Sequence, residues 1–159
     1  MKHVLVIYYS RTGHTQEMAN AIAQGAQLAG AQADCRSVYD VDIAQLVNYD
    51  AIILGSPSYY GSMAADVKKF LDSTISLHGK LRGKVGGAFC SSARVSGGNE
   101  TTLLSILHAF LVHGMILTGG TPTYPYGPVA IHAPNDDATR EECLAYGRMI
   151  AELAAKLSP

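Results

Sequence analysis

Short apolar runs alternate along the chain with stretches in which apolar residues recur every three or four positions. The runs at residues 4–9 and 51–54 are continuous, which is typical of strands covered on both faces of a sheet. Residues 84–90 also predict a strand, although they include Gly86 and Gly87, which indicate close packing from a neighbour. Residues 33–38 and 115–118 carry weaker versions of the same pattern. The chain is therefore expected to contain five strands.

The helical stripes fall between and after these runs. Apolar residues at helical spacing occupy positions 18–26, 67–71, 103–111 and 143–157, and each stripe predicts a helix. Residues 119–134 are rich in Gly, Pro and Tyr and show no periodicity, so we expect a surface excursion there.

Strands and helices alternate in the order of an α/β protein, with a parallel sheet and helices on both faces. Right-handed crossovers leave few topologies for five such strands, and the flavodoxin-like order 2-1-3-4-5 is favoured. We see no linker or repeat, so residues 1–159 are expected to form one domain of this three-layer sandwich. Ligands of such folds bind at the carboxyl ends of the strands, where the strand order reverses.

The first of three loops expected at that edge is small and polar, and it joins the first strand to the first helix. Gly13 permits a tight turn, and the N-terminus of the following helix presents backbone N–H groups that favour an anion. The hydroxyls of Ser10, Thr12 and Thr15 add neutral donors. Because capping a helix needs only one hydroxyl, we favour a phosphate cradle over a simple helix cap. The predicted cradle comprises Ser10, Arg11, Thr12, Gly13, His14 and Thr15.

The second and third loops offer surfaces for a flat ring. Two tyrosine rings can lie against a planar ligand, and the glycine beside them lets the backbone approach the ligand's edge. Small residues before the third helix can wrap a heterocycle with main-chain N–H groups. The second group comprises Pro57, Ser58, Tyr59, Tyr60 and Gly61, and the third comprises Ser91, Ser92, Ala93, Arg94, Val95 and Ser96.

Composition and missing motifs argue against several other classes of function. The 12 Lys and Arg residues balance 13 Asp and Glu residues, which argues against nucleic-acid binding. Neither GxxxxGK[ST] nor a GxGxxG after a strand occurs, which argues against a P-loop and a dinucleotide-binding Rossmann site. The apolar runs are too short for membrane insertion, and we see no signal-peptide pattern. Three widely spaced cysteines without a CxxC pair suit free thiols in the cytoplasm, and we expect no metal site.

The three loops resemble those of a known family. Residues 10–15 are similar to the FMN-phosphate signature of flavodoxins. Residues 55–64, 69–72, 83–89 and 97–104 are similar to segments of the WrbA-type NAD(P)H:quinone oxidoreductases and flavodoxin-like NADPH-dependent FMN reductases. The resemblance covers nearly the whole chain.

This resemblance implies that FMN is the cofactor and that NADH or NADPH is the electron donor. It implies that the first loop holds the FMN phosphate, that Ser58, Tyr59 and Tyr60 line the isoalloxazine, and that the third loop wraps the ring edge and the ribityl chain. It also assigns His113 a catalytic place beside flavin and substrate, against the alternative of a histidine that interacts with the dipole at a helix C-terminus.

The chain departs from this family in two ways. It has no tryptophan, although family members often carry one near the substrate, and the corresponding segment here contains His78. It is also shorter than typical members. The resemblance leaves the assembly open between a homo-oligomer of two or four copies and the monomer of flavodoxins.

Three functions are compatible with this pattern. The first is an FMN-dependent oxidoreductase that passes two electrons from NAD(P)H to a quinone-like acceptor. The alternative is a one-electron carrier between protein partners, but such carriers are typically very acidic, and the net charge here is only -1. The third is a flavin-binding module without turnover. We favour the first.

Overall fold

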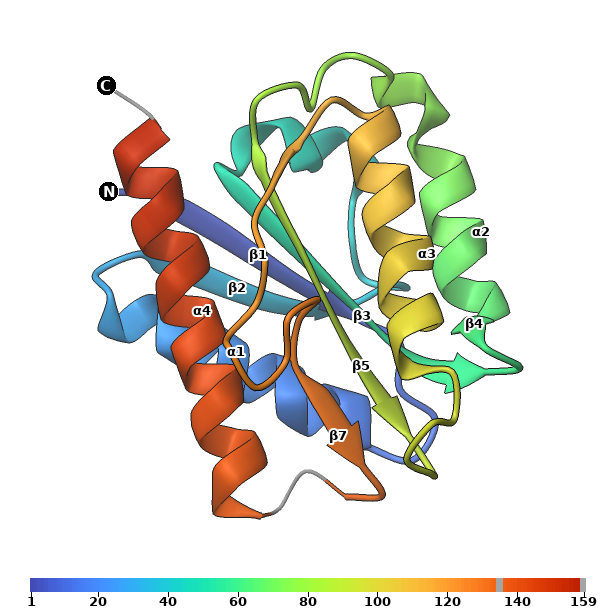
Figure 1. Ribbon diagram of the computed structural model, residues 1–159. Helices are drawn as coiled ribbons and strands as arrows, with labels where there is room; N and C mark the ends of the chain where they lie inside the picture. Colours follow the sequence, from blue (N-terminus) through green and yellow to red (C-terminus); the bar gives the residue numbers. More distant parts are fainter. Residues whose placement is uncertain (134–135, 158–159) are drawn as a thin grey trace.

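The computed structural model describes residues 1–133 and 136–157 and is built around a parallel sheet (Figure 1). Its five parallel strands along the main path are β1 (His3–Tyr8), β2 (Gln32–Ser37), β3 (Ala51–Tyr59), β5 (Val85–Ser92) and β6 (Ile116–Leu117). They lie in the order β2-β1-β3-β5-β6. Counted along the chain this is 2-1-3-4-5, so the predicted fold class and strand order are confirmed.

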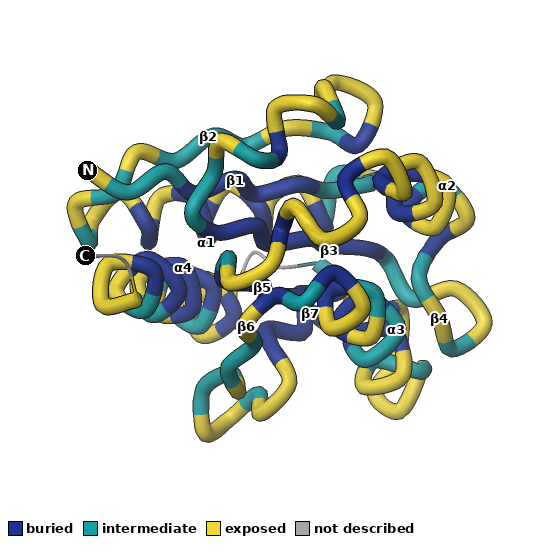
Figure 2. The backbone as a smooth tube through the Cα atoms, turned by 90° about the horizontal axis from the view of Figure 1, so that it is seen from above, coloured by how far each residue is buried: buried dark blue, intermediate teal, exposed yellow. Residues whose placement is uncertain are grey.

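Helices cover both faces of the sheet. They are α1 (His14–Leu28), α2 (Ala65–Ser73), α3 (Asn99–Val112) and α4 (Asp137–Leu157), with short 3-10 segments at Ile43–Asn48 and Thr74–Leu77. α1 and α4 lie against one face, and α2 and α3 lie against the other (Figures 1 and 2). No helix within residues 1–133 and 136–157 is long and apolar enough to span a membrane.

The continuous apolar runs of the central strands follow from this three-layer arrangement. In β1, Val4 and Val6 pack into the core between the sheet and the α1–α4 layer, whereas Leu5 and Ile7 pack into the core on the opposite face. All four side chains are buried, and Figure 2 shows the central strands in dark blue between exposed helix surfaces. A strand that faces two apolar cores has no polar side, so it lacks the polar-apolar alternation of a half-exposed strand.

α1 and α4 approach each other through two glycines. A Cβ atom at Gly147 would overlap the carbonyl oxygen of Ile22, and one at Gly25 would overlap the carbonyl oxygen of Leu144. The two helix backbones are therefore in direct contact, which no larger residue at these positions permits.

β3 continues beyond the end that the sequence predicted. The apolar run that predicts this strand covers only residues 51–54, but β3 runs to Tyr59 and then pairs in a hairpin with β4 (Ser62–Met63). The carbonyl of Gly55 accepts a hydrogen bond from Tyr9 on the β1 side. Pro57 faces the same side two residues later, where β1 has ended, so its missing N–H costs no ladder hydrogen bond.

The fifth strand is split, and this corrects the expected surface excursion over residues 119–134. β6 pairs with the start of β5, and β7 (Val129–Ile131) pairs with its end. Three residues between Pro128 and His132 are too short a run to predict a strand from periodicity. Hydrogen bonds to β5, far away in the chain, hold both ends of this segment. Cys90 N donates to Pro128 O, and His132 N donates to Ser92 O. Position 134 of that segment lies outside the described residues.

Candidate functional site

The three predicted loops meet at the carboxyl end of β1, β3 and β5. The hydroxyls of Thr15 and Ser91 are hydrogen-bonded at 2.8 Å, which ties the first loop to the third. The Ser58 hydroxyl lies 3.0 Å from the carbonyl oxygen of Gly97 and 3.1 Å from that of Gly98, which ties the second loop to the third. The expected convergence of the loops is therefore confirmed.

The first loop leaves the N-terminus of α1 without a side-chain cap. Gly13 is the N-cap residue, with a φ of 99° in the left-handed region that favours glycine. Its N–H donates to Ser10 Oγ over 3.0 Å, and within the described chain the backbone amides of His14 and Thr15 meet no acceptor. A Cβ at Gly13 would meet no atom within 4 Å, so open space lies next to these donors. This arrangement fits an anion such as a phosphate monoester.

Thr15 also joins two of the loops. Its side chain is only 2% exposed, and its hydroxyl is hydrogen-bonded to that of Ser91, so it fastens the first loop to the third. The other two predicted hydroxyls make no hydrogen bond to another loop of the described residues. Thr12 is exposed, and Ser10 keeps its own proton because its oxygen accepts from Gly13.

The second loop presents two tyrosine rings on a tight hairpin. Tyr59 pairs with Ser62, which leaves Tyr60 and Gly61 as a two-residue turn with φ values of 50° and 76°. Positive φ at both positions is the geometry of a type I′ turn, which is unfavourable for a residue with a bulky side chain. Tyr60 nonetheless occupies it and is fully exposed. A strained turn that exposes an aromatic ring at the edge of the sheet where ligands bind is consistent with contact between that ring and a planar molecule.

The third loop is folded tightly on itself. Ser92 Oγ accepts from Arg94 N over 3.1 Å and donates to Arg94 O over 2.6 Å, and Gly97 N also donates to Arg94 O. The amides of Ala93, Val95 and Ser96 have no acceptor within the described residues, so these main-chain donors are left for a ligand. The loop also exposes the apolar side chain of Val95 and the charged one of Arg94.

Gly98 and Thr102 belong to this arrangement, although the sequence did not single them out as site residues. Thr102 Oγ1 donates to Ser58 Oγ over 2.8 Å. Gly98 has a φ of 90°, and a Cβ there would overlap the Cα of Gly61. In the sequence, the Gly97-Gly98 pair just before the predicted third helix is the feature that could have indicated a close approach between two loops.

His113 lies away from the three loops. It is the C-cap of α3, whereas the loops meet the N-terminus of that helix, and 14 residues at 1.5 Å each separate the two ends by about 21 Å. The side chain is 9% exposed, with Nε2 2.7 Å from Thr74 Oγ1. The structure therefore does not bring His113 beside the other predicted site residues of the same chain.

The surroundings of His113 disfavour its protonated form. Thr74 Oγ1 donates to Leu71 O over 2.6 Å, so it accepts from His113 Nε2–H, and Nδ1 is buried without a partner among the described residues. Burial, and next the nearby His78, lower the pKa of His113 below its ordinary value. Both causes act against the imidazolium form, in which Nδ1 also carries a proton.

Comparisons with known proteins agree with this geometry. A family model described as flavodoxin domain matches residues 5–101. Two curated relatives are both named NAD(P)H dehydrogenase (quinone). That of Rhodopseudomonas palustris strain TIE-1 is 39% identical and that of Bradyrhizobium sp. strain BTAi1 is 40% identical, and each alignment covers 99% of both chains. A solved structure described as a flavodoxin, WrbA-like protein from Agrobacterium tumefaciens, superposes with a TM-score of 0.83 at 28% identity and covers 99% of this chain and 100% of that one.

The chain is shorter than these relatives. The alignment with the Bradyrhizobium protein spans 199 positions, of which the 159 residues here can fill at most 159, so at least 40 positions lack a counterpart. Since both chains are covered almost from end to end, much of this difference lies in gaps within the alignment.

Proposed function

The chain belongs to the flavodoxin-domain family of NAD(P)H dehydrogenases (quinone), and from this premise we propose that it passes two electrons from NAD(P)H to a quinone-like acceptor with FMN as cofactor. The net reaction converts NAD(P)H, a proton and a quinone into NAD(P)⁺ and a hydroquinone. The uncapped N-terminus of α1 is the structural observation that carries the proposal, because it offers an anion site where two ring-binding loops meet.

The residues present fit FMN. The first loop, with the amides of His14 and Thr15 and the hydroxyls of Ser10 and Thr12, would hold the phosphate. The second loop, Pro57, Ser58, Tyr59, Tyr60 and Gly61, and the third loop, Ser91, Ser92, Ala93, Arg94, Val95 and Ser96, would hold the ring system. When bound, FMN supplies the hydride and electron chemistry, and the chain binds and orients it.

The cysteine side chains do not compete with this role. Burial raises the pKa of Cys35 to about 11 and of Cys90 and Cys143 to about 12. The thiolate is the reactive form of cysteine, and at neutral pH these groups are almost wholly protonated. The chain's own thiols are therefore poor redox groups, which supports a bound cofactor as the electron carrier.

The first test is anaerobic reduction of the FMN-loaded protein by NADH and by NADPH, followed through the flavin absorption. We expect bleaching much faster than for free FMN at the same concentration, and recovery of the absorption when a benzoquinone is added. A bound flavin that neither nucleotide reduces, but that accumulates a stable one-electron state on photoreduction, would replace the enzyme with a one-electron carrier.

Gly13→Ala is expected to weaken FMN binding about tenfold. The added methyl group meets no protein atom, so the cost comes from the φ of 99° and from crowding at the proposed phosphate position. Fluorescence titration of apoprotein with FMN measures the change, and riboflavin, which lacks the phosphate, is the matched ligand. Equal FMN affinity in the variant and the parent would show that the FMN phosphate does not bind at this loop.

We also propose that two or more copies of the chain associate through the outer surface of α2 and α3. Ile75, Leu111 and Val112 are exposed there beside a groove that includes His78 and His113. Exposed apolar side chains grouped in this way are typical of an interface. Sedimentation velocity of the parent and of Val112→Glu tests this. A monomer in the parent protein would contradict the proposal.

A further inference from the structure

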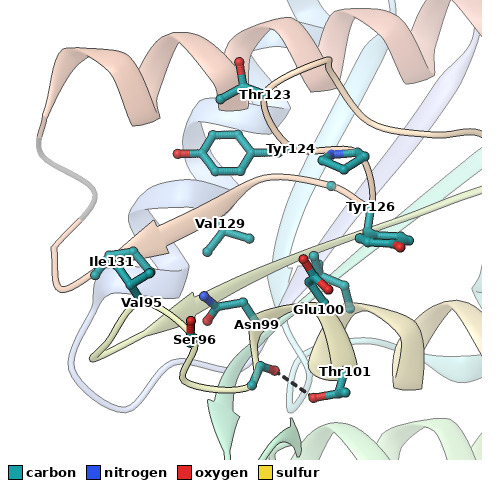
Figure 3. Close-up of a pocket in the computed structure, with 14 residues that line it drawn as sticks. Val95, Ser96, Asn99, Glu100, Thr101, Thr123, Tyr124, Tyr126, Val129 and Ile131 are labelled. Carbon is teal, nitrogen blue, oxygen red and sulfur yellow. Dashed lines mark hydrogen bonds between the residues drawn. The ribbon is translucent and has the colours of Figure 1, made fainter.

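A cavity of about 610 Å³ begins at the third loop and extends away from it (Figure 3). It lies between the first turn of α3 and residues 123–127, and β7 contributes to its wall. Val95 and Ser96 of the third loop form one end, so the cavity adjoins the proposed ring-binding site. Its size is in the range of small-molecule sites.

The lining of this cavity combines flat apolar surfaces with one carboxylate. Tyr124 and Tyr126 lie on one side, and the aliphatic side chains of Leu103 and Val129 also line it. Glu100, on the first turn of α3, also lines the cavity (Figure 3). None of the described residues that line the cavity is a Lys, Arg or His, so a phosphate group inside it would meet the negative charge of Glu100 and no positive charge from these side chains.

We propose that this cavity binds the adenosine end of NADH, and that Glu100 makes the chain select NADH over NADPH. The inference rests on the proposed function and deepens it by naming the donor. A planar adenine fits between tyrosine rings and aliphatic side chains. Asn99 also lines the cavity, and its Oδ1 is buried without a partner among the described residues, so this side-chain amide keeps unused hydrogen-bonding capacity beside the proposed base site.

Glu100 distinguishes the two nucleotides through the ribose. A carboxylate accepts hydrogen bonds from the 2′-hydroxyl of NADH, as acidic residues do in other NAD sites. NADPH replaces this donor with a phosphate of about two negative charges, which the carboxylate repels. A quinone has only acceptor oxygens, so it offers the carboxylate no donor, and the chemistry favours the nucleotide over the acceptor.

The dinucleotide's own negative charge has a partner outside the cavity. Arg94 precedes Val95 in the third loop, is exposed, and forms no ion pair with a carboxylate of the described residues. It is the cationic residue closest in sequence to the point where the cavity meets the ring-binding site. The pyrophosphate that links the two halves of NADH would pass this point.

Calorimetry with nicotinamide-free ligands tests the inference without any redox step. ADP-ribose and its 2′-phosphorylated form are titrated into FMN-loaded protein. We expect ADP-ribose to bind at least tenfold more tightly. Glu100→Gln is expected to bring the two affinities within about threefold, and Glu152→Gln, an equal charge change at an exposed site on α4, is expected to leave the ratio unchanged. The ratio of NADH to NADPH reduction rates should follow the same order.

Tyr126→Ala tests whether both ligands bind in this cavity, because it removes part of the cavity wall without changing the charge. It is expected to weaken both ligands by a similar factor and leave their ratio intact. Equal binding of the two ligands to the parent protein, or a ratio that Glu100→Gln leaves unchanged, would overturn the inference. If NADH reduces the flavin under those conditions, the proposed function stands without it. If ADP-ribose binds with the expected selectivity and neither nucleotide reduces the flavin, the cavity assignment stands and the proposed function fails.

Discussion

Replacing Gly147 with alanine is expected to lower the free energy of unfolding by about 3 kcal/mol, the upper end of the usual cost of overpacking. The new methyl group would overlap the carbonyl oxygen of Ile22 and lie 3.0 Å from the amide nitrogen of Ala26. Both atoms belong to the backbone of α1, so no side-chain rotation relieves the contact. α4 would have to move outward, and this would loosen the core that it closes with Ile150 and Tyr146.

Urea denaturation of the parent and the variant measures this loss. Alanine is the better helix former, so helix propensity alone would make Gly147→Ala stabilising. The sign of the change therefore separates packing from propensity. Ala145→Gln on the exposed side of the same helix is the control, and we expect it to change the free energy of unfolding by less than about 0.5 kcal/mol. A variant as stable as the parent would show that α1 and α4 can separate without cost.

The strand order and the meeting of the three loops were predictable because both follow from local signals. A strand buried on both faces is apolar without interruption, as in β1, where Val4 and Leu5 enter opposite cores. Strands of this kind together with weaker ones, five in all and joined by helices, leave few topologies, and the topology alone places three loops at one edge.

The features that the sequence did not predict depend on partners far away in the chain. β7 is a strand only because β5 extends past β6 and offers free hydrogen-bonding groups to residues 129–131. The hydrogen bond of 2.8 Å between the hydroxyls of Thr15 and Ser91, which lie 76 positions apart, is another contact of this kind. A hydroxyl has the same appearance in the sequence whether it binds a ligand or a neighbouring loop.

His113 shows the same limit for a single residue. Its place at the end of a helix was visible in the sequence, and so was its similarity to a family position. The direction of α3, whose other end meets the loops, separates it from them within one chain. Thr74, to which it is hydrogen-bonded, lies 39 positions earlier and carried no signal of that contact.

Gly98→Ala is expected to weaken FMN binding about 100-fold, the largest effect on the proposed site. A Cβ at this position would overlap Gly61 Cα and lie 3.2 Å from Ser58 Oγ, while the φ of 90° strains any residue with a side chain. The second and third loops would have to move apart, and the hydrogen bonds from Ser58 to the carbonyls of Gly97 and Gly98 would break. The ring system is proposed to bind between surfaces that these bonds hold in place.

Gly79→Ala separates the movement of the loops from backbone strain in general. Gly79 has a φ of 80°, but a Cβ there meets no atom within 4 Å, and it lies between α2 and β5 at the opposite edge of the sheet. Both variants should lose about 1–2 kcal/mol of stability from the strained φ. Only Gly98→Ala should lose FMN affinity, measured by quenching of flavin fluorescence on binding. An affinity within threefold of the parent would mean that the contact between the two loops does not shape the flavin site.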